Sequence, residues 1–374
     1  MSQQVALPPV LVLFGGRSAE SDVSVISGTA IAAALLDAGA TVTQAHIARD
    51  GALRLLPTDH RRGDLPGGAY TDLTAPALLG VQAVTLESYL ASVAASAPET
   101  IVVPALHGPG DEDGTIAAAA AAAGLNYVGD TPRVAALGMD KPAFKSLARD
   151  VGVATLPELI ITRMDWSSDR AGQLRAIAEF AEAHASNGAL IGKPAAHGSS
   201  FGMKIAHTSH DWTDVVDEAL RFGDRAMLEP YLKRARELEV AVLERTSGAV
   251  HAFGPGEVFP GREFYDYDAK YAPGVSRTTT SSDLPLAVAD EMRAAAVKLF
   301  GEAGSRGLSR LDFLMARSGE RAGHWYLSEV NTFPGFTPIS LFPALVMASG
   351  MTFTELCVEL VAAAAARPAP HTAQ

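Results

Sequence analysis

The segment from 307 to 331 carries side chains that could bind a metal ion and an oxyanion. It reads as two strands joined by a charged connection with two glycines, which is the pattern of a hairpin. Because strand side chains alternate between faces, Arg310 shares a face with Asp312, and Glu329 shares one with Asn331. Antiparallel pairing would then gather two carboxylates and an amide oxygen, the hard ligands that Mg²⁺ takes alongside substrate phosphates. The guanidinium of Arg310 can neutralise a developing negative charge.

A solvated hairpin face is the alternative interpretation of the same residues. The turn Pro334-Gly335, just past the second strand, favours a binding site instead. Its backbone N–H groups would lie near the metal ligands, where they can receive an anion.

A lysine before a glycine-rich loop indicates phosphate binding. Lys193 lies near the end of a strand predicted at 189–194, and the loop at 197–202 follows it. A lysine charge combined with loop amides can hold phosphate groups. The spacing is not that of a Walker A motif, and a plain surface hairpin is the simpler interpretation of the loop taken alone.

The segment at 264–271 combines three tyrosines, two aspartates and a lysine, without apolar periodicity. Such a composition favours a mobile polar loop, about 261–283, that closes over a polar ligand. A surface loop with incidental aromatic residues is the alternative.

Two loops in the first third of the chain carry further candidates. Glu20 follows a glycine turn between the first predicted strand and helix, where an open α/β sheet binds ligands. It could hold a substrate ammonium group or only complement the helix dipole. The dinucleotide fingerprint Gly-x-Gly-x-x-Gly is missing there. His107 precedes an acid-rich loop whose spacing fits neither an EF-hand nor a zinc site.

The elements that must position these residues alternate in the first third. The apolar run at 10–14 predicts a buried parallel strand, and 41–47 and 100–106 predict two further strands. Helices are predicted to end near 38 and to span the alanine run at 117–123. This alternation is typical of a doubly wound α/β domain.

From about residue 140 the pattern becomes α+β. The predicted elements are a helix from Lys141, strands at 189–194, 226–232 and 237–243, a helix at 286–303, the hairpin and a helix at 353–366. We expect an N-terminal α/β domain at 1–139, a central α+β domain at 140–228, a C-terminal domain at 229–374 that carries the hairpin and the polar loop, and a disordered tail from 367.

Composition narrows the class of protein. The 374 residues are 48% hydrophobic and 19% charged, as in a globular protein, and the net charge of -12 argues against nucleic acids and anionic membranes. The single cysteine, Cys357, excludes an intrachain disulfide, which fits a protein in a reducing compartment. Its apolar helical surroundings predict that it is a buried packing residue. The first apolar run is too short for a signal peptide or a membrane span, so we expect a cytoplasmic protein.

Eight motifs together resemble the D-alanine–D-alanine ligase family over nearly the whole chain. In order they are Phe14-Gly-Gly-Arg-Ser-Ala-Glu20, Leu106-His-Gly-Pro109, Met139-Asp-Lys141, Lys193-Pro194, Gly198-Ser-Ser-Phe-Gly202, Tyr265-Asp-Tyr-Asp-Ala-Lys-Tyr271, Arg310-Leu-Asp312 and Glu329-Val-Asn-Thr-Phe-Pro-Gly-Phe-Thr337. Each is modest alone, but their order and approximate spacing are specific.

The resemblance implies an ATP-grasp fold with ATP between the central and C-terminal domains. One D-alanine carboxylate would attack the γ-phosphate of ATP to give an acyl phosphate, which the amine of a second D-alanine would then displace. The product would feed peptidoglycan synthesis. The resemblance further implies two Mg²⁺ ions, with Mn²⁺ as a possible substitute, small-molecule substrates and a homodimer.

The resemblance also implies roles for residues at matching positions. Metal ligands would be Asp312, Glu329 and Asn331, in agreement with the patch derived above. Residues that contact ATP would be Lys141, Lys193, Ser200, Glu229, Glu237 and Lys270. Catalytic residues would be Glu20, Ser199 and Tyr271 at the first ammonium group, and Arg310 and the Gly335 amide at the tetrahedral oxyanion. Substrate carboxylates would lie near His107, Ser340 and Leu341.

Several positions depart from the family pattern. Asp111 replaces a glycine, Ala117-Ala118 replaces Gln-Gly, Ser328 stands where asparagine is frequent, and one extra residue separates Glu229 from Glu237. These changes leave open another acceptor, such as D-serine, D-lactate or another small amino acid, in a specialised or antibiotic-related pathway. Tyr271 favours an amine acceptor. The rival of another class is a non-catalytic ATP-binding protein, against which the intact metal ligands and Arg310 argue.

Overall fold

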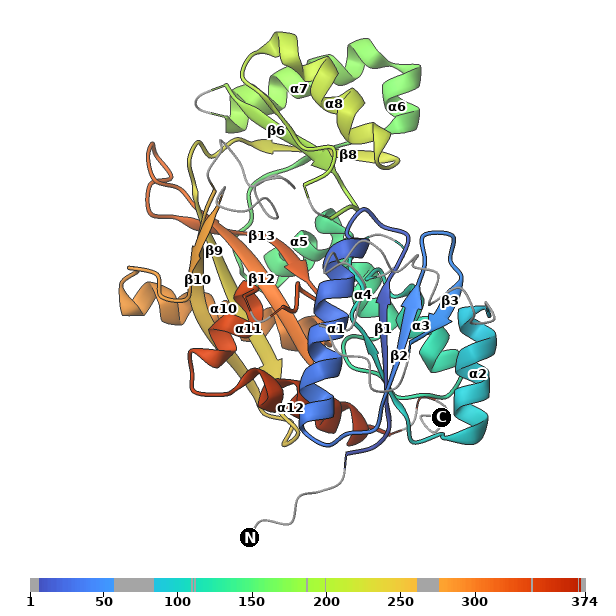
Figure 1. Cartoon of the computed structure of the whole chain (residues 1–374). Helices are drawn as coiled ribbons and strands as arrows, with labels where there is room; N and C mark the ends of the chain where they lie inside the picture. The colour runs from blue at the N-terminus through green and yellow to red at the C-terminus, as the bar shows by residue number, and fades with distance from the viewer. Residues whose placement is uncertain are drawn as a thin grey trace.

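The computed structural model describes residues 7–56, 84–108, 110, 112–185, 188–198, 200–260, 276–337, 339–368 and 370 (Figure 1). Strands in these ranges form three sheets. We call them the N-terminal sheet, with strand order β3-β2-β1-β4, the central sheet, β5-β8-β6-β7, and the C-terminal sheet, β11-β10-β9-β12-β13. The predicted mixture of α/β and α+β structure is confirmed.

The N-terminal sheet has parallel strands at its centre. Strand β1 (Val10–Gly15) lies between β2 (Val42–Ile47) and β4 (Ile101–Pro104) and is parallel to both, while β3 (Leu53–Leu55) pairs antiparallel with β2. The helices of this region are α1 (Ser21–Asp37), α2 (Leu86–Ser96) and α3 (Thr115–Ala122).

Both faces of this sheet are buried. Val12 and Phe14 pack in one core with α1, whereas Leu11 and Leu13 pack in another with α2 and α3. Helices on both faces confirm the doubly wound prediction, and they explain why the strand at 10–14 is apolar without alternation.

The central sheet is antiparallel and covered on one face. Its strands are β5 (Leu159–Thr162), β6 (Leu190–Pro194), β7 (Lys204–Ala206) and β8 (Arg225–Pro230). Helices α6 (Arg163–Ser168), α7 (Arg170–His184) and α8 (Trp212–Arg221), with a 3₁₀ turn at Ser209–Asp211, complete this region. These helices lie on the side of the sheet away from the rest of the molecule (Figure 1), so the opposite face looks toward the C-terminal sheet.

The C-terminal sheet is antiparallel throughout. Its strands are β9 (Arg236–Glu244), β10 (Val250–Phe259), β11 (Arg277–Thr279), β12 (Leu308–Met315) and β13 (Trp325–Asn331). Helices α4 (Pro132–Met139), α5 (Lys141–Asp150) and α10 (Leu286–Ala303) share one core with it. Helices α11 (Leu341–Met347) and α12 (Phe353–Ala365) pack in a second core that also contains β1 and α1.

The hairpin and the helix at 286–303 are confirmed, but one strand of this sheet was missed and one expectation is wrong. Strand β10 was not predicted, because Gly254-Pro255-Gly256 in its middle resembles a loop and coincides with a shift in the β9 register. The loop expected at 261–283 contains β11 near its end, paired with β10. Residues 261–275, and with them the proposed closing segment, lie outside the described residues.

The tail expected to be disordered from 367 is ordered at its first residue. The Arg367 guanidinium pairs with Glu244 at 2.7 Å and donates to the carbonyls of Tyr127 and Gly129. Asn126 in turn donates to the Arg367 carbonyl. Arg367 is thus attached to both the N-terminal region and the end of β9. Residues 369 and 371–374 lie outside the described part.

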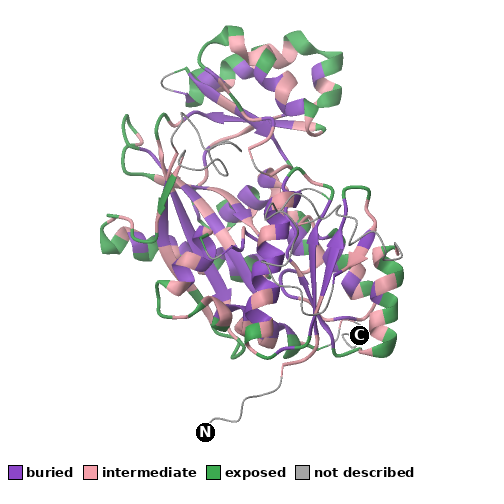
Figure 2. Ribbon diagram, in the orientation of Figure 1, coloured by how far each residue is buried: buried purple, intermediate pink, exposed green. Residues whose placement is uncertain are grey.

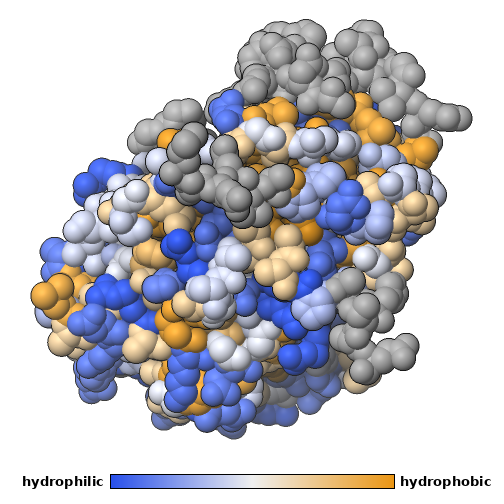
Figure 3. All heavy atoms as spheres, turned by 90° about the horizontal axis from the view of Figure 1, so that it is seen from below, coloured by the Kyte–Doolittle hydropathy of each residue, from blue (hydrophilic) through white to orange (hydrophobic). Residues whose placement is uncertain are grey.

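Burial follows the layers, with buried strands between helices whose outer faces are exposed (Figure 2). Cys357 is buried in α12, as predicted. None of the helices in the described ranges is long and apolar enough to span a membrane. The face seen from below mixes hydrophilic and hydrophobic residues without one broad apolar patch in its coloured parts (Figure 3).

The division into three domains stays a prediction. The boundary expected between 228 and 229 falls inside β8 of the central sheet. Helix α5, expected in the central domain, buries Phe144 and Ala148 in the core of the C-terminal sheet.

Candidate active site

A cleft of about 990 Å³ lies between the central and C-terminal sheets. Its wall includes Lys193 and Glu229 from the central sheet, and Glu237, Arg310, Asp312 and Glu329 from the C-terminal sheet. Six candidate residues that are far apart in sequence therefore face one cavity, whose size suits a small-molecule ligand.

The hairpin brings its four candidate side chains together as the sequence predicts. Asp312 stands opposite Glu329, and Arg310 opposite Asn331, in the register of β12 and β13. Arg310 binds both carboxylate oxygens of Asp312 at 2.7 Å, in a fork-to-fork arrangement. The Asn331 amide donates to Asp312 Oδ2 at 3.0 Å.

A third carboxylate on this face was missed. Glu239 of β9 stands opposite Asp312 on its other side, and its Oε2 lies 3.1 Å from Arg310 Nε. Burial alone would lower the pKa of Arg310, but Asp312 and Glu239 raise it well above its ordinary value. The signal was available, because Glu237 and Glu239 share a face by alternation. Their pairing with β12, however, is a long-range contact.

The donor set fits a magnesium ion that completes its shell with phosphate oxygens and water. Asp312, Glu329 and Asn331 supply hard oxygen atoms from adjacent strands. Across the part of the chain that the structure describes, no three His, Cys, Asp or Glu side chains form a complete metal cluster.

Lys141 links the metal patch to the loop after β6. Its Nζ lies 3.2 Å from Glu329 Oε2 and donates to the carbonyl of His197 at 2.5 Å. Asp140 caps the helix that begins at Lys141, so the lysine projects from a fixed first turn.

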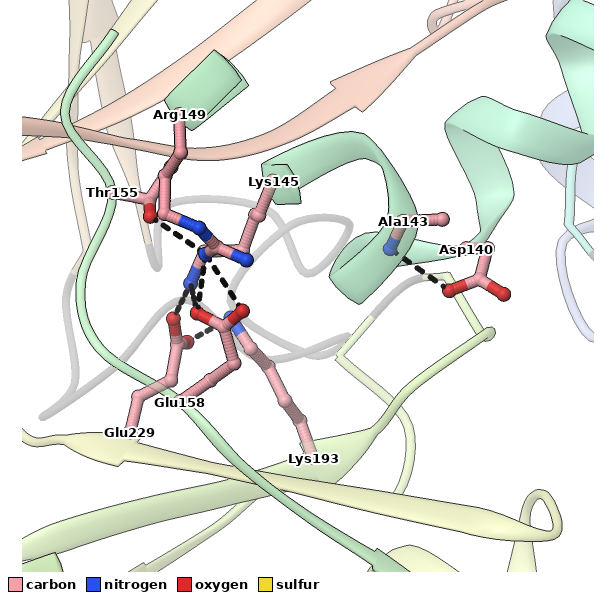
Figure 4. Close-up of polar contacts among 8 residues, drawn as sticks. All are labelled: Asp140, Ala143, Lys145, Arg149, Thr155, Glu158, Lys193 and Glu229. Carbon is pink, nitrogen blue, oxygen red and sulfur yellow. Dashed lines mark hydrogen bonds and ion pairs between the residues drawn. The ribbon is translucent and has the colours of Figure 1, made fainter. Parts of the chain in front are cut away.

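A second charged cluster forms the back of the cleft (Figure 4). Lys193 Nζ lies 2.6 Å from Glu229 Oε2, and Lys145 pairs with Glu229 Oε1. Burial alone would raise the pKa of Glu229, but the two lysines lower it to about 2. Glu229 is thus a buried anion held between two cations. Lys145 was not singled out from the sequence, although it lies one turn after Lys141 on α5.

Some of the remaining residues that were expected to contact ATP or substrate lie in the cleft, and others lie outside the described part of the chain. Ser200 and Glu237 line the cleft, and Ser200 has a φ of 58°, the left-handed conformation that is uncommon for a serine. Ser199, Lys270 and Tyr271 lie outside the described residues.

Glu20 lies at the entrance of α1 and is buried, yet its side chain does not cap the helix. Cβ atoms built on Gly108 and Gly198 would lie 3.1 Å and 3.6 Å from Glu20 Oε2. Glu112, which was missed, approaches Gly198 equally closely. Burial, and then the charge of Glu20, raise the pKa of Glu112 to about 8. Two carboxylates thus converge beside the glycine loop at 197–202.

His107 connects this pocket to the turn after the metal hairpin. Its Nε2 lies 3.1 Å from Ser27 Oγ, which accepts the backbone N–H of Phe336 at 3.2 Å. Burial lowers the pKa of His107, although Glu20 opposes the shift. A neutral imidazole is therefore favoured at this position.

The remaining candidates lie at the start of α11. Ser340 Oγ accepts the backbone N–H of Thr337 at 3.1 Å, and Gly335 lies beside the same side chain. The Leu341 side chain is buried in the core, so contact with a substrate carboxylate would have to use its backbone.

Two sequence models of known domains match most of the chain. The model described as D-ala D-ala ligase N-terminus matches residues 9–130, and the model described as D-ala D-ala ligase C-terminus matches residues 147–362. The chain belongs to the D-alanine–D-alanine ligase family. The sequence resemblance is confirmed, and so is the prediction of a ligase.

Relatives named D-alanine–D-alanine ligase match this family member at nearly full length. The one from Heliobacterium modesticaldum is 34% identical, covering 94% of this chain and 93% of the relative. The one from Streptomyces coelicolor is also 34% identical, covering 96% and 94%, and the one from Methylobacterium sp. is 36% identical, covering 96% and 92%.

Solved structures show that the fold is that of the family, the ATP-grasp fold. A D-alanine–D-alanine ligase from Coxiella burnetii aligns with a TM-score of 0.74 at 24% identity, covering 96% of this chain and 94% of the other. A D-Ala:D-Ser ligase from Enterococcus faecalis aligns with a TM-score of 0.76 at 22% identity, covering 96% and 99%. These likenesses concern the fold and leave the acceptor open.

Proposed function

We propose that this ligase joins two D-alanines into D-alanyl-D-alanine at the expense of ATP, in the cytosol, for peptidoglycan synthesis. The observation that carries the proposal is the cleft of about 990 Å³ in which the fork-paired Arg310–Asp312 and Glu329 face Lys193 and Glu229. Asn331 lies beside this group and donates to Asp312. It combines phosphate-binding cations with oxygen ligands for a metal.

In the proposed reaction, Asp312, Glu329 and Asn331 would hold Mg²⁺, which would neutralise phosphate charge. Lys141 and Lys193 bind the phosphate chain of ATP. The carboxylate of the first D-alanine attacks the γ-phosphorus, the bond to the bridging oxygen breaks, and ADP leaves. The protein's contribution is position and electrostatics.

The second half of the reaction forms the peptide bond. The amine of the second D-alanine, after losing a proton, attacks the acyl carbon, and the C–O bond to phosphate breaks. Arg310 and the Gly335 amide stabilise the tetrahedral oxyanion, while Glu20 holds the first ammonium group. His107 lies near the first carboxylate, and Ser340 and the Leu341 backbone receive the second.

Phosphate release from Mg-ATP tests the proposal. The reactions would contain D-alanine, L-alanine, or D-alanine with D-serine or D-lactate, and products would be identified by mass. Turnover with D-alanine alone, giving the dipeptide, is expected. Turnover only with a mixture would assign another acceptor, and ATP binding without any turnover would favour a non-catalytic protein. We also infer a homodimer, which light scattering would test.

A further inference from the structure

Lys145 lies behind the cleft rather than on its wall. Its side chain is 1% exposed, and it contacts Glu229 together with Glu158, whose Oε2 is 3.6 Å from the lysine Nζ. Lys193 and Glu229 line the cleft, whereas Lys145 does not. Glu229 is therefore the residue that both contacts Lys145 and faces a ligand in the cleft (Figure 4).

The contact joins the two bodies that form the cleft. Lys145 is carried by α5, whose Phe144 and Ala148 are buried with the C-terminal sheet. Glu229 and Lys193 belong to β8 and β6 of the central sheet. Lys145 thus reaches across from one side to hold a carboxylate of the other.

The contact between Lys145 and Glu229 changes the charge balance around Lys193. Glu229 carries one negative charge, and two buried ammonium groups bind its two oxygens. Glu158 does not neutralise Lys145 by itself, because Arg149 also binds both Glu158 oxygens, at 2.7 Å and 2.9 Å. Without Lys145, Glu229 and Lys193 would form a closed neutral pair in a buried site, where opposite charges attract strongly.

We propose that Lys145 is a positioning residue for nucleotide binding: by sharing Glu229 with Lys193, it leaves Lys193 with positive charge to offer to a phosphate. The role rests on the proposed function, in which Lys193 contacts the phosphate chain of ATP. It differs from a direct ligand role, because the lysine acts only through the carboxylate. It also explains why a fully buried lysine lies behind a phosphate-binding lysine.

A double-mutant cycle tests the role. Dissociation constants for Mg-ATP would be measured for the wild type, Lys145→Met, Glu229→Gln and the double variant, with adenosine inhibition constants beside them. Lys145→Met is expected to weaken Mg-ATP binding at least about fivefold while changing adenosine binding less than about twofold. In the Glu229→Gln background the same substitution should change Mg-ATP binding less than about twofold.

Glu158→Gln is the matched control, because it removes the other carboxylate near Lys145 and leaves Glu229 shared. Its Mg-ATP binding should stay within about twofold of the wild type. If Lys145→Met does not fold, Lys145→Gln, which keeps a donor but no charge, should show the same loss.

Three results would overturn the role. The first is unchanged Mg-ATP binding in Lys145→Met. The second is an equal loss of affinity for Mg-ATP and for adenosine. The third is a Lys145→Met loss of Mg-ATP affinity that is as large in Glu229→Gln as in the wild type. Failure of the wild type itself to bind Mg-ATP would instead contradict the proposed function, so the two failures are distinguishable.

Discussion

Arg310 organises the polar face of the C-terminal sheet because it contacts carboxylates from two strands. Its fork binds Asp312, and its Nε also lies within 3.1 Å of Glu239. Such a pre-paired guanidinium needs little reorganisation when a negative charge develops beside it. A substitution of Arg310 is therefore the most direct test of the proposed mechanism.

Arg310→Ala is expected to lower kcat by about 10²–10³-fold while Mg-ATP affinity changes little, since its charge is used mainly in the transition state. Steady-state kinetics and calorimetry would measure the two quantities. Arg310→Lys, which keeps the charge and loses the fork, should be intermediate. Near-normal turnover in Arg310→Ala would remove this residue from the mechanism.

Asp130 lies outside the active site, and its burial is expected to make the free energy of unfolding depend on pH. Burial raises its pKa from 3.8 to about 8, although the Arg306 backbone N–H and Arg367 oppose the shift. The folded state therefore retains a proton that the unfolded chain releases. The resulting stabilisation is complete below pH 3.8 and is lost as the pH rises to about 8.

Urea unfolding of the wild type and Asp130→Asn between pH 5 and 8.5 would measure this effect. The asparagine variant keeps an acceptor for the Arg306 N–H but cannot ionise. We expect the free energy of unfolding of the wild type to fall relative to the variant as the pH rises. Parallel pH curves would contradict the raised pKa.

Among the helices and strands, the close approach of Gly28 in α1 to Phe14 in β1 fixes the position of the helix on the sheet. A Cβ built on Gly28 would lie 2.4 Å from Phe14 Cβ, so only glycine allows this approach. Glu20 stands at the start of the same helix. A shift of α1 would therefore move the candidate ammonium ligand as well as the core.

Gly28→Ala is expected to lower the free energy of unfolding by about 1–3 kcal/mol through overpacking, and to raise the KM for D-alanine. Chemical denaturation and steady-state kinetics would measure both. Gly301→Ala in α10 is the matched control, since a Cβ there meets nothing within 4 Å. That change should stabilise the protein by up to about 1 kcal/mol. Equal behaviour of the two variants would argue against the packing explanation.

What could be predicted from sequence is mostly local. The alternation around Asp312 and Glu329 predicted the hairpin and the grouping of Asp312 with Glu329 and Asn331, because two strands joined by a short connection have few ways to pair. The shift in register after Asp312 was not predicted. Glu239, Lys145 and Glu112 escaped notice because their partners come from other strands, helices and loops. Strand β10 was missed for a different reason, since its Gly-Pro-Gly segment has loop composition and only tertiary pairing makes it a strand.

At the scale of the whole molecule, Arg367 joins the end of the chain to two regions. Arg367→Ala removes its pair with Glu244 and its bonds to the Tyr127 and Gly129 carbonyls. Because both charged side chains are partly exposed, we expect a loss of about 1–3 kcal/mol in the free energy of unfolding. Thermal and urea unfolding would measure it, with Arg367→Lys as the charge-retaining control. Unchanged stability would show that the tail is not anchored in solution.

The core that β1 and α1 share with α11 and α12 constrains how the chain folds as it is synthesised. Val12 and Phe14 belong to the same cluster as Leu356, Leu360 and Val361. The first helix therefore leaves the ribosome long before the last helix that covers it. Until residue 361 emerges, the N-terminal sheet has an apolar surface open to water or to a chaperone. We therefore expect the core around Val12 and Phe14 to be completed only after residue 361 has been made.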